Sequence, residues 1–169
     1  MDADYRPFRQ PLAPGRARAI PWLSVVAGSL LATLPLVVTI PILPPFGLLM
    51  LLAWRLIAPF ALRRWAAGPL GLFDDLVSGQ PLGSAVLLWS LCFLAIELVE
   101  QRLLFREFWQ DWLIAAGAAA FCLIAGRFIA VPLAAHVDAI VGVQAAATAL
   151  LFPVAARLVA WIDAKRGMV

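Results

Sequence analysis

The sequence has few charged residues for its length. They make up 14% of the 169 positions, whereas apolar residues make up 64%. Soluble globular domains carry roughly 25% charged residues, so this composition excludes an ordinary water-soluble domain. A membrane-spanning helix needs about 20 apolar residues, and the chain has room for about five or six such helices. The sequence therefore predicts an all-α integral membrane protein.

Histidine and cysteine are also scarce, which limits the chemistry that the chain can support. His136 is the single histidine, and the two cysteines, Cys92 and Cys122, lie in the middle of apolar runs. Neither a metal-ligand set nor a disulfide framework fits this pattern, and we expect both thiols to be reduced and buried. The sequence also lacks a Gly-rich phosphate loop and a Gly-x-Ser-x-Gly elbow. It therefore predicts no catalytic residue, no cofactor and no metal.

Positive charge is concentrated in four short polar segments between the apolar runs. Cytoplasmic flanks of membrane helices collect Lys and Arg, so we predict that all four segments and both chain termini are cytoplasmic. The net charge of +3 then reflects contact with acidic membrane lipid and does not indicate nucleic acid. Ten of the thirteen Lys and Arg residues form these segments: Arg6, Arg9, Arg16, Arg18, Arg63, Arg64, Arg102, Arg106, Lys165 and Arg166.

Five apolar runs are predicted to span the membrane: residues 20–43, 46–62, 82–100, 112–131 and 139–162. Five crossings would separate the basic segments, so the charge rule requires one more. The remaining candidate is 65–77, which is too short for an ordinary span and is predicted to be a short third span. The predicted organisation is a disordered cytoplasmic tail at 1–19, a six-helix transmembrane domain at 20–163 and a cytoplasmic tail at 164–169.

Several ionisable residues fall within the predicted spans, where an unpaired charge is costly. Counting along the predicted helices places Arg55 at nearly the depth of Asp74 and Asp75, so we predict an intramembrane ion pair among them. Such a pair is either a structural link for the short span or a substrate or proton site. Glu97 and Glu100 are predicted to pair with Arg157 of the last span.

Small residues recur at four-residue spacing on the fifth predicted span: Ala118, Cys122 and Gly126. This spacing places them on one helix face, which permits close approach of another helix. The face either packs within the bundle or binds a single-span partner.

The segment 71–83 reads Gly-Leu-Phe-Asp-Asp-Leu-Val-Ser-Gly-Gln-Pro-Leu-Gly. It resembles the signature of the MreD family of bacterial rod shape-determining membrane proteins, in which Asp, Leu, any residue, Ser and Gly close a short span. Chain length, the Pro-containing first span and Phe152-Pro153 in the last span extend the similarity over residues 20–166. The matching motif positions are Gly71, Asp75, Ser78, Gly79 and Gly83, whereas Asp74 has no counterpart.

The resemblance implies a non-catalytic scaffold of the cell-elongation machinery in the bacterial inner membrane. Its implied direct partner is MreC, and indirect ones are the RodA glycosyltransferase, a penicillin-binding transpeptidase and MreB. The resemblance also implies a six-helix fold similar to the substrate-binding subunits of energy-coupling-factor vitamin transporters. A small-molecule-binding transporter subunit is therefore the alternative function, and it would require an outward cavity with polar or aromatic contacts. A lipid-processing enzyme would require a reactive set of residues, which the sequence lacks.

Overall fold

The computed structural model describes residues 14–31, 44–102, 107–130 and 139–168. Over these ranges the chain forms six α-helices, one short 3-10 turn and no strand. The all-α prediction is confirmed. The elements are α1 (Pro14–Leu31), α3 (Phe46–Ile57), the 3-10 turn η1 (Arg64–Ala66), α4 (Ala67–Ser78), α5 (Ser84–Glu100), α6 (Phe108–Ala130) and α7 (Ala139–Met168).

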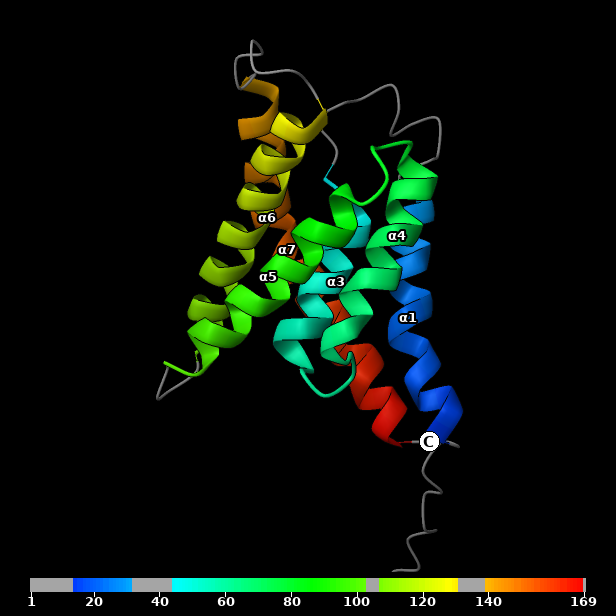
Figure 1. The fold of residues 1–169 in the computed structure, drawn as a ribbon. Helices are drawn as coiled ribbons and strands as arrows, with labels where there is room; N and C mark the ends of the chain where they lie inside the picture. Colours follow the sequence, from blue (N-terminus) through cyan, green and yellow to red (C-terminus); the bar gives the residue numbers. More distant parts are fainter. Residues whose placement is uncertain (1–13, 32–43, 103–106, 131–138, 169) are drawn as a thin grey trace, which may run out of the picture.

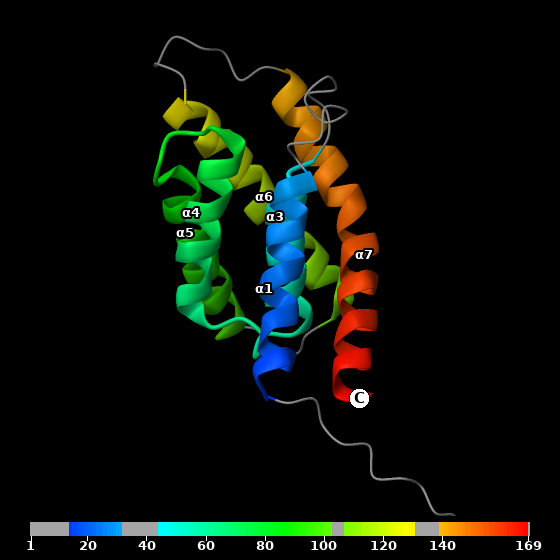
Figure 2. The same ribbon diagram turned by 90° about the vertical axis from the view of Figure 1, so that its right-hand side faces the viewer.

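The helices run alternately in opposite directions along the bundle (Figure 1). One end carries the start of α1, the α3–α4 connection, the end of α5 and the end of α7 (Figures 1 and 2). We call it the basic end, because Arg63, Arg64, Arg102 and Lys165 belong to these segments. The opposite end contains the short connection 79–83 between α4 and α5, and we call it the hairpin end.

α3 lies at the centre of the bundle, between α1, α6 and α7. Leu51, Leu52 and Trp54 are fully buried on it, as expected for a helix that is apolar on every side. α3 ends at Ile57, earlier than the predicted end at residue 62. The reason is Pro59, because the residue before a proline is disfavoured in the helical conformation.

Other helix ends also differ from the predicted ones. α1 begins at Pro14, inside the segment predicted as a disordered tail, and proline is favoured in the first helical turn. α7 continues to Met168, through most of the predicted C-terminal tail. The rest of the first predicted span (32–43) and the single histidine, His136, lie outside the described residues.

The surface of the described bundle is rich in large apolar side chains. The exposed fraction is 64% for Leu76 on α4. It is 73% for Leu150 and 62% for Val154, which lie on successive turns of α7. Exposed large apolar side chains occur on α1, α4, α5, α6 and α7, so this surface fits a hydrocarbon environment. Within the described residues, two helical segments are long and apolar enough to cross a membrane, Phe108–Ile129 and Ile140–Lys165. α1 and α3 contribute shorter apolar segments.

Candidate functional site

Asp75 links α4 to the beginning of α5. Its Oδ2 accepts a hydrogen bond from the backbone N–H of Gly83 at 2.8 Å. Its Oδ1 accepts from the Ser84 hydroxyl at 2.8 Å and from the Ala85 N–H at 2.9 Å. The first N–H groups of a helix lack partners in their own helix, and Gly83, the N-cap residue, has no side chain to supply one. Asp75, which is 1% exposed, therefore caps α5 from the preceding helix.

The glycines of the motif allow the same hairpin to close. A Cβ on Gly71 would come within 2.8 Å of the α5 backbone, so only glycine fits where the two helices meet. Gly79 follows α4 with φ +69°, and Gly83 precedes α5 with φ +95°, in a region that L side chains rarely adopt. Ser78 is the last residue of α4 and is exposed. The motif residues therefore build a tight helical hairpin, and the aspartate holds it closed.

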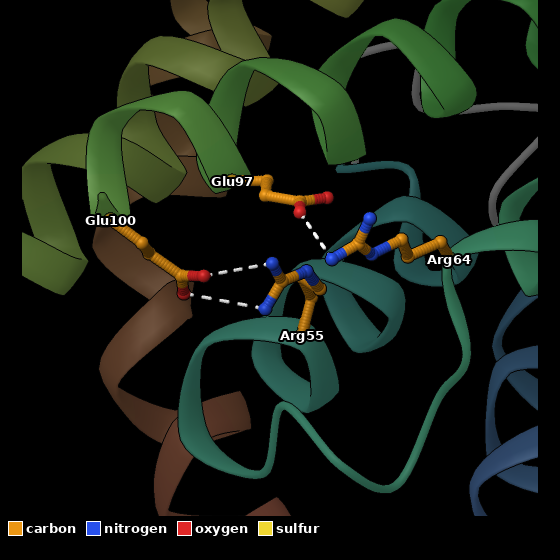
Figure 3. Close-up of polar contacts among 4 residues, drawn as sticks. All are labelled: Arg55, Arg64, Glu97 and Glu100. Carbon is orange, nitrogen blue, oxygen red and sulfur yellow. Dashed lines mark hydrogen bonds and ion pairs between the residues drawn. The ribbon is translucent and has the colours of Figure 1, made fainter.

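Two ion pairs join α5 to the α3–α4 region at the basic end (Figure 3). Arg55 makes two hydrogen bonds to the Glu100 carboxylate, at 2.8 and 3.3 Å, and the side chains are 9% and 20% exposed. The Arg55 guanidinium also lies 5.8 Å from the centre of the Phe93 ring. Arg64 pairs with Glu97 at 2.5 Å, but its own side chain is 83% exposed. The Arg55–Glu100 pair is thus the more shielded of the two.

The predicted ion pair between Arg55 and Asp74 or Asp75 is wrong. A continuous helix over 46–62 would place Arg55 about two turns inside the boundary. Because α3 ends at Ile57, Arg55 lies in its last turn, at the basic end, where α5 also ends. Likewise, Glu97 and Glu100 pair with Arg64 and Arg55 rather than with the exposed Arg157.

The small-residue face of α6 is turned largely into the bundle. Cys122 is 6% exposed, and its Sγ lies 3.2 Å from the Sγ of Cys92 on α5. Both thiols are free. Gly126 faces Leu88 of α5, whose Cδ1 would lie 3.7 Å from an added Cβ. Of the two alternatives for this face, packing within the bundle is the one observed for Cys122 and Gly126, which lie against α5.

A separate apolar groove of about 410 Å³ runs between α5 and α6. Its small residues are Ala95, Gly117 and Ala118, and a Cβ added to Gly117 would meet nothing within 4 Å. The walls include Leu113 and Phe121, which are 50% and 47% exposed. Of the three predicted partner-binding residues, only Ala118 lines this groove. The complete lining is Leu91, Cys92, Ala95, Ile96, Val99, Leu113, Ile114, Gly117, Ala118 and Phe121.

A cavity of about 250 Å³ lies towards the hairpin end, between α4, α5, α6, α7 and the start of α3. Unlike the groove, it is lined by charged and polar side chains as well as apolar ones. Asp74 contributes from α4 and Arg127 from α6, and the further polar and aromatic residues are Gln80, Ser84, Trp89 and Gln144. Asp74 therefore lies apart from Asp75, which faces the α5 cap. No group of three metal-ligating residues occurs among the residues that the structure describes.

The sequence matches the family described as rod shape-determining protein MreD over residues 18–164. The chain belongs to the MreD family. As an MreD protein it is a rod shape-determining membrane protein, and the hairpin motif lies inside the matched region. No curated protein and no solved structure matches the chain.

Sequence reasoning missed two features of this MreD chain. The first is the partner of Arg55: the signal was Pro59, which ends α3 and moves Arg55 to the level of Glu100. The second is Gly117, which lies one residue before the small-residue face and opens onto the groove. A glycine beside an alanine in a span indicates close packing, but the sequence does not indicate on which side.

Proposed function

We propose that this protein is a non-catalytic scaffold of the inner membrane that binds MreC through a membrane helix. Membership of a rod shape-determining family carries this proposal. The apolar groove between α5 and α6 supports it, since it offers a surface on which a helix can pack. Through MreC, the scaffold supports the RodA glycosyltransferase and its penicillin-binding transpeptidase along MreB filaments.

The proposed topology has six crossings with both termini in the cytoplasm. The alternating helix directions support it, because they bring the start of α1 and the end of α7 to one end (Figure 1). The short α4 has 12 residues, or about 18 Å of helix, so it requires neighbours that shield its polar groups. A fold similar to energy-coupling-factor substrate-binding subunits stays a prediction.

Reporter fusions test this topology. We expect a reporter joined after Arg64 or Arg102 to be cytoplasmic and one joined after Gln80 to be outside. The physical reason is that Arg63, Arg64 and Arg102 flank the basic end, whereas residues 79–83 carry no Lys or Arg. A cytoplasmic reporter at Gln80 would refute the six-crossing topology.

The docking surface that we propose is the α5–α6 groove, where Ala118 and Gly117 leave room for a partner helix. Lipid provides no hydrophobic drive for association between helices, so close packing at small residues must stabilise the contact. The groove consists almost wholly of apolar side chains and needs no charged partner, which fits a single membrane-spanning helix of MreC.

Gly117→Leu should reduce the amount of MreC that co-purifies in mild detergent by roughly tenfold, because the leucine would occupy the groove. Gly142→Leu on α7 is the matched control. Both glycines are exposed on long helices, and an added Cβ would meet nothing within 4 Å at either position. Each substitution also removes a poor helix former. Docking in the groove would be contradicted if both variants lost MreC to the same extent, or if neither variant lost it.

The alternative function is a small-molecule-binding membrane subunit of a vitamin-type transporter. The polar cavity favours it, since a carrier requires such a space with polar and aromatic contacts. The two functions differ in their partners. Recovery of a membrane-embedded transporter subunit in place of MreC would favour the carrier.

A further inference from the structure

The chain has two cysteines, and they meet at one point between α5 and α6. Cys92 and Cys122 are 30 positions apart in the sequence, and their Sγ atoms are 3.2 Å apart. The sulfur atoms of a disulfide are about 2.05 Å apart, so a combined movement of about 1.2 Å brings this pair to bonding distance. Both thiols are free in the structure. The pair is therefore placed for a disulfide that has not formed.

Hydrogen bonds hold the two sulfur atoms toward each other. The Cys92 thiol donates to the backbone carbonyl of Ala118 on α6, with the sulfur 3.7 Å from the oxygen. The second hydrogen bond joins the two sulfur atoms themselves. Both side chains are buried inside one bundle, which favours a bond within the chain over a bond between two chains.

Each thiol nevertheless lines a cavity. Cys92 lines the apolar groove between α5 and α6, and Cys122 lines the polar cavity towards the hairpin end. Structural cysteines that are buried on every side are inert. The groove is bordered by the half-exposed side chains of Leu113 and Phe121, so it is open to the apolar surface of the bundle. An uncharged oxidant dissolved in the membrane therefore has a route to Cys92.

We propose that Cys92 and Cys122 form an intramolecular disulfide when the chain meets a hydroperoxide. In the first step, the Cys92 sulfur takes the terminal OH group of the peroxide, the O–O bond breaks, and the leaving oxygen receives the thiol proton. The products are a sulfenic acid and an alcohol. In the second step, the Cys122 sulfur attacks the sulfenic sulfur, the S–S bond forms, and the hydroxyl group leaves with the Cys122 proton as water. Two thiols are oxidised, and one peroxide is reduced.

The bond would connect α5 to α6 in the interior of the bundle. It closes a loop of about 30 residues, and a disulfide of this kind stabilises a protein mainly by restricting its unfolded chain. We expect the oxidised chain to unfold at a temperature roughly 5 to 10 °C higher than the reduced chain. A thiol reductant should reverse the effect. An unchanged or lower unfolding temperature would contradict this stabilising role.

Intact-mass spectrometry of the purified full chain in mild detergent tests bond formation. The probe is cumene hydroperoxide, which is apolar, and free thiols are labelled with a maleimide after denaturation. We expect the native chain to lose about 2 Da and to take up no label, and a reductant should restore both labels. Two free thiols after treatment, or a bond found only between two chains on a non-reducing gel, would overturn the proposal.

The matched control combines Cys122→Ser with Ile124→Cys. It keeps one thiol on each helix, but residue 124 lies about 200° around α6 from residue 122, where Ile124 is exposed. This variant should form no bond within the chain. If it loses 2 Da as readily as the native chain, the bond does not depend on the observed contact, and the proposal is wrong.

Cys122→Ser alone tests the first step. Oxidation should then stop at the sulfenic acid of Cys92, which dimedone traps as an adduct on that residue. Absence of the adduct would contradict Cys92 as the first site of oxidation. All of these measurements use the chain without MreC, so their failure leaves the scaffold function intact.

Discussion

Asp75→Ala should produce the largest loss of folded protein of any single change in the α4–α5 hairpin. The carboxylate is 1% exposed and accepts three hydrogen bonds, two of them from the backbone at the start of α5. Removing it leaves buried N–H groups without an acceptor, which we expect to cost on the order of 3 to 5 kcal/mol. Asp75→Asn keeps one acceptor oxygen and should lose less. Folded yield and thermal unfolding in detergent measure both effects.

Asp74→Ala is the matched control, because it removes a carboxylate from the same helix without touching the α5 cap. We expect a clearly smaller loss of folded yield. Arg55→Leu should not rescue Asp75→Ala, since Arg55 pairs with Glu100 at the basic end. Similar losses for the two aspartates, or rescue by Arg55→Leu, would contradict the capping role.

The hairpin was the part of the molecule most accessible from the sequence, and its physics explains why. The hairpin needs a Gly that can adopt positive φ and an Asp close to the start of the next helix. These requirements fall within about a dozen residues, so they leave a local pattern in the sequence. The motif that the resemblance singled out contains Gly71, Asp75, Gly79 and Gly83, and the structure places all four in this hairpin. It did not reveal that Asp75 caps α5. The distance from the Asp75 carboxylate to the first turn of α5, which contains Ser84 and Ala85, depends on the angle between the two helices.

Contacts between helices distant in sequence were harder to predict. Apolar periodicity gives the face of a helix but not which neighbour covers it, so Cys122 and Gly126 were compatible with either packing or docking. The structure turns them to Cys92 and Leu88. The predicted ion pairs were especially sensitive to the predicted ends of the helices. An error of a few residues in the end of α3 moved Arg55 from the level of the aspartates to that of Glu100.

Glu100→Ala should destabilise the basic end strongly, because it leaves the Arg55 guanidinium without its bidentate partner. The Arg55 side chain is 9% exposed, and breaking a buried pair by removing one member costs about 3 to 5 kcal/mol. Replacing both Arg55 and Glu100 with leucine should restore most of the thermal stability, since two apolar side chains leave no unpaired charge.

Glu97→Ala is the control for this experiment. It breaks the other ion pair at the same end of α5, but its partner Arg64 is 83% exposed and can be solvated. Exposed pairs contribute about 0 to 1 kcal/mol, so thermal unfolding of Glu97→Ala should stay close to that of the native chain. The decisive comparison is between Glu100→Ala and the double leucine variant. If the double variant is no more stable than Glu100→Ala, the cost does not come from the unpaired Arg55, and Glu100 stabilises the protein through other contacts.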